Sequence, residues 1–159
     1  MTWISRRVPL KRSSKPIARR ARPRSRIPKA LGTHRERVKY ANDLWRRLIY
    51  AKEPSGICPR CRARKWHDAA HCFAKGPYPA LRFELENGAP LCRPCHTRVD
   101  SDHHAKVEFF TRYIGAVEYE RLRLRALSRA KSDLALTILY LERASRSGAA
   151  VVSRPVGPT

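Results

Sequence analysis

Two Cys-x-x-Cys pairs constrain the fold of this chain more than any other feature of its sequence. The first pair is Cys58 and Cys61, the second is Cys92 and Cys95, and 30 residues lie between them. Four thiolates satisfy the tetrahedral coordination of zinc and leave no open position, so the expected site is structural. The neighbouring arginines disfavour the two alternatives, four buried thiols without metal and an iron–sulfur cluster. We expect zinc to hold together an otherwise polar, turn-rich stretch.

The charge balance indicates a polyanionic partner. The 159 residues include 35 Lys and Arg against 13 Asp and Glu, giving a formal net charge of +22. So many positively charged side chains repel one another unless an anion offsets their charge, and nucleic acid is the simplest such anion. Residues 1–32 contain no acidic residue and carry four prolines. We expect them to form a flexible basic arm that contacts nucleic acid, rather than a tail that only aids solubility.

Cysteine usage and hydropathy bear on the location of the protein. Five cysteines, four of them at metal-ligand spacing, suit a reducing compartment better than a disulfide framework. The fifth, Cys72, has no partner at that spacing and is expected to be a small, half-buried residue. No apolar run reaches the roughly 18 residues of a membrane span, and the N-terminus lacks the apolar segment of a secretory signal. We therefore expect a cytoplasmic protein with no membrane partner.

Helical periodicity flanks the cysteine region on both sides. Thr33 and Glu36 have the spacing of a capping box, and apolar residues, Trp45 among them, then recur at helical intervals up to Lys52. Downstream, the pattern predicts helices over 104–114, 116–130 and 133–144. Within the cysteine region, the segment 81–83 is typical of a short β piece, and Pro94 suits the first turn of a helix.

These patterns predict a small α+β protein. The expected order is a basic arm (1–32), an N-terminal helix (33–54), a zinc-bound core (55–114), C-terminal helices (115–145) and a disordered tail (146–159).

The insert between the cysteine pairs contains residues that a structural zinc site does not need. Asp68 and His71 precede Asn87, and His96 follows the second pair directly. A neutral imidazole can take a proton from water, an amide can fix a loop, and a divalent ion held by few ligands can polarise a phosphate. A His–Asn–His set around two Cys-x-x-Cys pairs resembles the HNH (ββα-metal) endonucleases. That resemblance implies a zinc-stabilised, treble-clef-like ββα core.

Within the HNH endonucleases, the sequence resembles in particular the NinG/Rap family of bacteriophage recombination endonucleases. It is carried by residues 66–71, residues 81–87, the second cysteine pair and the helical stretch to about residue 125. The resemblance implies a metal-dependent DNA endonuclease that hydrolyses phosphodiester bonds. Its expected substrates are branched or flapped DNA recombination intermediates of a bacteriophage, in the cytoplasm of the bacterial host.

The resemblance also assigns catalytic roles. His71 is expected to be the general base that activates water, and Asn87 to hold the loop that carries this base. Arg82 is expected to contact a phosphate, because the guanidinium fork matches phosphate geometry.

A second set of residues is expected to bind the catalytic ion, Mg²⁺ or Mn²⁺. His96 and Asp68 are its first candidate ligands, and Asp102 is a further one. Many HNH enzymes have an Asp or His directly before the base, where this chain has Ala70. The full ligand set is therefore left open by the sequence.

Other functions fit the same composition. One alternative is a zinc-stabilised nucleic-acid-binding module without catalysis, and another is an HNH accessory nuclease in phage DNA packaging. We expect phosphates to be held by the arm and by the arginines of the helix beyond residue 116, which are Arg121, Arg123, Arg125 and Arg129. A homodimer through the apolar helix 134–141 is a further expectation, since symmetric cuts in a junction need two sites.

Overall fold

The computed structural model describes residues 32–128 and 132–147. The basic arm, the end of the helix predicted to reach residue 130, and most of the predicted tail lie outside these residues. The elements, in chain order, are α1 (His34–Ala51), β1 (Asp68–His71), the 3-10 helix η1 (Pro79–Leu81), β2 (Gly88–Leu91), α2 (Arg93–Ser101), α3 (His103–Ile114), α4 (Ala116–Leu127) and α5 (Leu134–Arg146). This arrangement confirms the α+β class.

Helix α1 begins where the sequence predicts. The Thr33 hydroxyl accepts a hydrogen bond from the Glu36 N–H, and the Glu36 carboxylate accepts one from the Thr33 N–H, which completes the capping box. Lys52 is the C-cap. The apolar face of the helix is buried, and Trp45 is 2% exposed, so its expected place in the core is confirmed.

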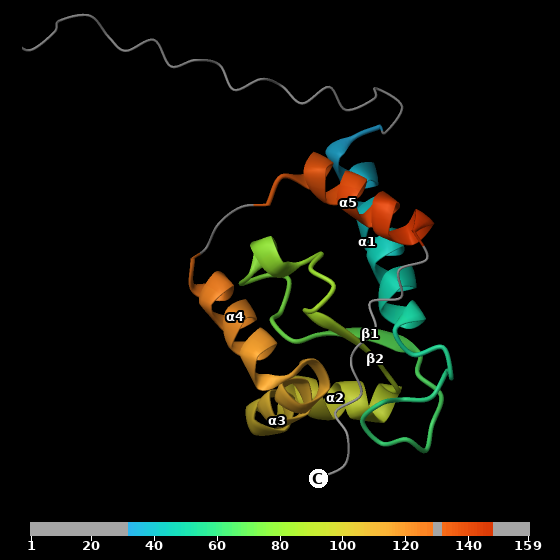
Figure 1. The fold of residues 1–159 in the computed structure, drawn as a ribbon, viewed down its shortest axis with the longest axis vertical. Helices are drawn as coiled ribbons and strands as arrows, with labels where there is room; N and C mark the ends of the chain where they lie inside the picture. Colours follow the sequence, from blue (N-terminus) through green and yellow to red (C-terminus); the bar gives the residue numbers. More distant parts are fainter. Residues whose placement is uncertain (1–31, 129–131, 148–159) are drawn as a thin grey trace, which may run out of the picture.

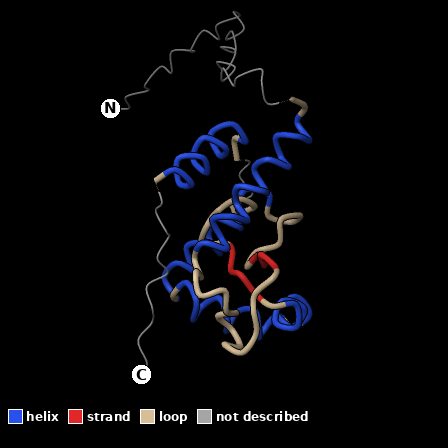
Figure 2. The backbone as a smooth tube through the Cα atoms, turned by 90° about the vertical axis from the view of Figure 1, so that its right-hand side faces the viewer, coloured by secondary structure: helices blue, strands red, loops and turns tan. Residues whose placement is uncertain are grey.

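The centre of the fold is a two-stranded antiparallel sheet. Asp68 pairs with Leu91 at one end, and His71 pairs with Gly88 at the other. The hairpin lies between α1 on one side and α2 and α3 on the other (Figures 1 and 2). Because side chains alternate along a strand, Ala70 packs into the core beside α2 and α3, whereas Ala69 packs against the core formed by α1 and α5.

The prediction of a short β segment at 81–83 is wrong. The segment forms η1 and a series of turns, in which the N–H groups of Arg82, Glu84 and Gly88 each donate to the carbonyl three residues earlier. Leu81, Phe83 and Leu85 are nevertheless buried. Burial at every second residue gives the segment a strand-like pattern, although its backbone has no strand to pair with among the described residues.

The C-terminal helices follow the predicted order with small shifts. Pro94 lies in the first turn of α2, as expected. In α3 the buried residues include Phe109 and Phe110, whereas Val107 and Ile114 are only partly buried. Helix α5 is capped by the Asp133 side chain.

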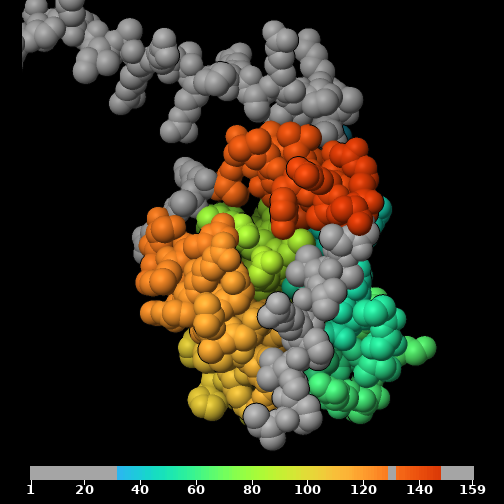
Figure 3. Space-filling view, viewed as in Figure 1, coloured from blue at the N-terminus to red at the C-terminus, as the bar shows by residue number. Residues whose placement is uncertain are grey.

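Helix α5 lies at the top and α4 at the left of the face seen in Figure 3, and the green part of the chain that includes η1 shows at the surface between them. Their outer faces carry exposed apolar side chains, which are Val117, Leu124, Leu127, Leu136, Leu139 and Tyr140. No helix within the described ranges combines the length and the hydropathy that a membrane crossing requires.

Gly88 is required by a close approach of α1 to β2. A Cβ atom at this position would lie 2.5 Å from Cζ2 of Trp45 and 2.7 Å from Cδ1 of Ile49. Both neighbours are buried, so neither can move aside without disturbing the core.

We predict that Gly88→Ala lowers the free energy of unfolding by about 1–3 kcal/mol, the usual cost of overpacking a core. Denaturant unfolding measures the change. Gly76→Ala is the matched control, because a Cβ there meets nothing within 4 Å and the backbone is not in the left-handed region. Equal stability of the two variants would contradict the packing of α1 on β2.

Candidate functional site

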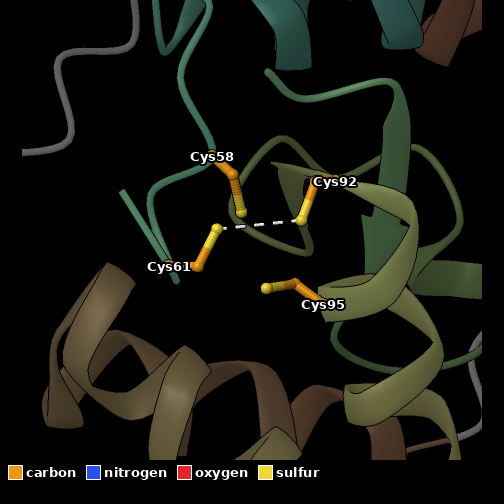
Figure 4. Close-up of side chains that lie close together, drawn as sticks. All are labelled: Cys58, Cys61, Cys92 and Cys95. Atoms are coloured by element: carbon orange, nitrogen blue, oxygen red, sulfur yellow. Dashed lines mark hydrogen bonds between the residues drawn. The ribbon is translucent and has the colours of Figure 1, made fainter. Parts of the chain in front are cut away.

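The four cysteines of the two Cys-x-x-Cys pairs come together in space, as predicted (Figure 4). Their sulfur atoms all lie within 4.8 Å of one another. The Sγ atoms of Cys61 and Cys92 are 3.8 Å apart. A tetrahedral zinc ion with bonds of about 2.3 Å requires its sulfur ligands to be about 3.8 Å apart. The four cysteines can therefore hold a structural metal ion such as zinc.

Local backbone structure shapes the first cysteine pair. The N–H of Cys58 donates to the Arg64 carbonyl, and the N–H of Arg62 donates to the Cys58 carbonyl. Hydrogen bonds from the backbone N–H groups of Ala63 and Arg64 help to lower the pKa of the Cys61 thiol to about 6. Burial raises the pKa of Cys95 to about 12. Since zinc binds the thiolate, metal binding at this site must release protons.

The fifth cysteine stands apart from this cluster. Cys72 is 4% exposed and packs in the core beside α2 and α3, so it is more deeply buried than the sequence indicates. Burial raises its pKa to about 12, which keeps the thiol neutral and unreactive.

His71 lies at the end of β1, where its ring is held on two sides. The ring stacks on Trp45 with centroids 4.2 Å apart and an interplanar angle of 13°. Its Nε2 is 3.0 Å from the Arg82 carbonyl oxygen. A carbonyl can only accept, so in the neutral ring Nε2 carries the proton and Nδ1 keeps its lone pair. Burial is the main cause that lowers the pKa of His71 below its ordinary value, and nearby positive groups add to it.

Asn87 is fully buried and fastens the segment between the strands. Its Oδ1 accepts a hydrogen bond of 2.7 Å from the Phe73 N–H, and its Nδ2 donates to the carbonyls of Phe73 and Leu81, at 3.0 and 2.8 Å. Every polar atom of the amide therefore bonds to the backbone that follows His71. Asparagine before glycine is typical of a simple turn, but this one joins two parts of the insert.

Lys52 is a buried polar residue beside the candidate site that the sequence did not point to. It is 8% exposed, and its ammonium donates to the carbonyls of Leu85 and Gly88, on either side of Asn87. Burial lowers its pKa to about 8. A lysine at the end of a helix is normally read as a solvated residue, so no local signal could have revealed this contact.

A second polar cluster lies on the α2 side of the hairpin. Nδ1 of His96 is 3.3 Å from Oδ2 of Asp68, and its Nε2 is 3.1 Å from Oδ2 of Asp100. Arg93 contacts the other oxygen of Asp68, and Lys106 contacts that of Asp100, both at 3.1 Å. Oδ2 of Asp68 is buried and, despite its nearness to His96, accepts no well-aligned hydrogen bond.

The two remaining candidates have local partners. The Arg82 side chain lies over the Phe83 ring and donates to Oδ1 of Asn42 at 3.4 Å, so it pairs with neither of its neighbouring glutamates. Asp102 caps α3 through the Ala105 N–H and pairs with Arg98 at 2.9 Å.

The structure thus assembles the predicted residues into two groups. His71, Arg82 and Asn87 are joined through the insert on the side of α1, and Asp68 and His96 meet on the side of α2. Within the described residues, the cysteines are the only set of three or more Cys, His, Asp or Glu whose donor atoms converge within 4.8 Å.

Comparisons with known proteins give no match to this chain among family models, curated proteins or solved structures.

We predict that the purified protein binds one zinc ion per chain and that Cys61→Ser abolishes this binding, because the substitution removes one of four ligands. Metal analysis of the purified variants measures the content, and thermal unfolding reports the stability that the ion supplies. Cys72→Ala is the control, since it removes a thiol outside the cluster. Retention of one zinc ion by Cys61→Ser would contradict the site.

Proposed function

We propose that this protein is a divalent-metal-dependent endonuclease of the HNH type that hydrolyses phosphodiester bonds in DNA. The observation that carries the proposal is the state of His71: a neutral imidazole, oriented by the Arg82 carbonyl, on a hairpin that continues into a helix bearing His96. The order of strand, strand and helix around two cysteine pairs is what the HNH resemblance implies.

The general base is His71 in this proposal. The Arg82 carbonyl fixes the Nε2–H tautomer, so Nδ1 is the atom that accepts a proton from the attacking water. Burial lowers the pKa of the ring, which keeps it unprotonated at neutral pH. Stacking on Trp45 and the anchoring of the insert by Asn87 hold the ring in a single orientation.

Asp68 and His96 are the residues that would hold the catalytic ion. Their facing oxygen and nitrogen atoms are 3.3 Å apart. Two ligands at right angles on an ion with bonds of about 2.1 Å lie about 3.0 Å apart, so the pair fits Mg²⁺ or Mn²⁺ with water in the other positions. The buried Asp68 oxygen, which accepts no aligned hydrogen bond, is also suited to ligate a cation. When bound, the ion would polarise the phosphate and stabilise the leaving oxygen.

Asp100 has a supporting role in the same site. It contacts the second nitrogen of His96, as carboxylates do behind metal-binding histidines, and Lys106 holds it from the other side. Alternation along β1 directs Asp68 and His71 toward different helices, so in this proposal the scissile phosphate would lie between the ion and the base, within reach of both.

Recombination intermediates remain the proposed substrates, on the strength of the NinG/Rap resemblance. Cleavage rates on linear, flapped and four-way DNA test this choice, because only a junction enzyme should prefer branched forms. A preference for linear DNA would favour the packaging nuclease instead.

We predict that the protein nicks plasmid DNA with Mg²⁺ or Mn²⁺ and that His71→Ala lowers the rate by about 10²–10⁴-fold, the usual contribution of a general base. His67→Ala is the matched control, since His67 is exposed and four residues away. Absence of cleavage with either ion would favour a binding module, and full activity in His71→Ala would reject His71 as the general base.

The pH dependence of kcat/KM gives an independent test. Activity needs unprotonated His71, so the rate should fall as pH drops through the pKa of this group. Since burial lowers that pKa from 6.5, we expect the acid limb contributed by His71 to lie below pH 6.5. An acid limb above that value would contradict the assigned base.

A further inference from the structure

We propose that the loop of the first cysteine pair, residues 59–65, is the surface that binds the DNA backbone beside the catalytic site. This inference rests on the proposed function in taking DNA as the partner. It names the side chains that contact phosphates, which are Arg60, Arg62, Arg64 and Lys65, and we refer to them as the knuckle cations.

The knuckle cations form an uncompensated positive patch. All four are exposed, and no acidic residue occurs between Glu53 and Asp68. None of the four has an acidic side chain within ion-pair distance among the residues that the structure describes. Arg60 contacts the Cys95 sulfur, but the counterions of the other three in solution are small ions, and releasing such ions is what drives binding to the phosphate backbone.

The arginines of α4 differ from the knuckle cations in this respect. Arg121 pairs with Glu118 and Arg123 with Glu120 on the same helix, and Arg125 pairs with Glu84 at 2.7 Å. A guanidinium that already holds a carboxylate must give up that partner before it can hold a phosphate. The sequence predicts that these arginines bind phosphates. Because they are already ion-paired, the structure favours the knuckle cations as the phosphate-binding groups.

The loop is rigid enough to present its charges in a fixed arrangement. Its ends are tied by the bridge between Ile57 and Lys65 and by the hydrogen bond from the Cys58 N–H to the Arg64 carbonyl, 2.8 Å long. Arg62 has a φ of 53°, in the left-handed region that residues other than glycine rarely adopt. Such a conformation persists when its surroundings fix it, here a turn that follows Cys61 and is closed by the hydrogen bond from the Arg62 N–H to the Cys58 carbonyl.

The loop also lies beside the proposed catalytic centre. It leaves the end of α1 and runs along the edge of the molecule into β1, whose first residue is Asp68 (Figure 1). Nη1 of Arg60 is 3.7 Å from Sγ of Cys95, the residue before His96. A backbone held by the knuckle cations would therefore pass close to Asp68 and His96. Contacts of charge with phosphate read no base sequence, so this surface should bind DNA of any sequence.

The test compares two triple variants that remove equal charge. The first is Arg62→Gln/Arg64→Gln/Lys65→Gln, which spares Arg60 because it touches a cysteine of the cluster. The second is Arg112→Gln/Arg121→Gln/Arg123→Gln, whose arginines each pair with a glutamate one turn earlier. Fluorescence anisotropy of a labelled duplex, without Mg²⁺ or Mn²⁺ so that no cleavage occurs, gives the affinity as a function of salt.

We expect the first triple variant to reduce the slope of log affinity against log salt concentration by about 2–3, close to 0.9 for each lost phosphate contact. The second should change it by less than about 1. Equal changes in the two variants, or a larger change in the second, would overturn the proposal. Arg62→Lys/Arg64→Lys should keep the wild-type slope if charge alone acts, and loss of binding in that variant with one zinc ion retained would also overturn it.

The outcomes separate this inference from the proposed nuclease. Cleavage by the wild type together with an unchanged slope in the first variant would reject the knuckle surface and leave the nuclease in place. A reduced slope without any cleavage by the wild type would support the surface and reject the nuclease.

Discussion

The arrangement of this protein depends on a cluster of four cysteine sulfurs that joins the chain before β1 to the chain after β2. Strands of four residues, alone in a two-stranded sheet, are marginal in water. A metal ion held by the cluster would tie both ends of this hairpin together and fix the start of α2, which follows Cys92 directly. The second restraint is steric: Trp45 and Ile49 of α1 approach β2 so closely that only glycine fits at position 88.

These restraints place chemically different groups on the two sides of one hairpin. On the α1 side, the imidazole of His71 is stacked, hydrogen-bonded to a carbonyl and partly desolvated. On the α2 side, the carboxylate of Asp68 faces the imidazole of His96. The buried amide of Asn87 and the buried ammonium of Lys52 hold the segment between the strands in place through hydrogen bonds to its backbone groups. A larger protein would use more secondary structure for this purpose.

Local signals were sufficient to predict much of this architecture. The capping box at Thr33, the cysteine spacing and Pro94 each depend on neighbours in sequence, and each has the expected place in the structure. The segment 81–83 shows the limit of such reasoning, because alternate burial arises there in consecutive turns as well as in strands. The roles of Lys52 and Gly88 depend on contacts between residues more than 30 positions apart, and no local pattern encodes them.

We propose that the hairpin held by the four cysteines carries a second, catalytic cation site apart from the sulfur cluster. Anomalous diffraction from crystals of the zinc-loaded protein soaked in Mn²⁺ can locate both ions. We expect a manganese peak between Asp68 and His96, in addition to a zinc peak among the four sulfurs. Manganese absent from that position, with the zinc peak present, would contradict the proposed nuclease while leaving the structural cluster intact.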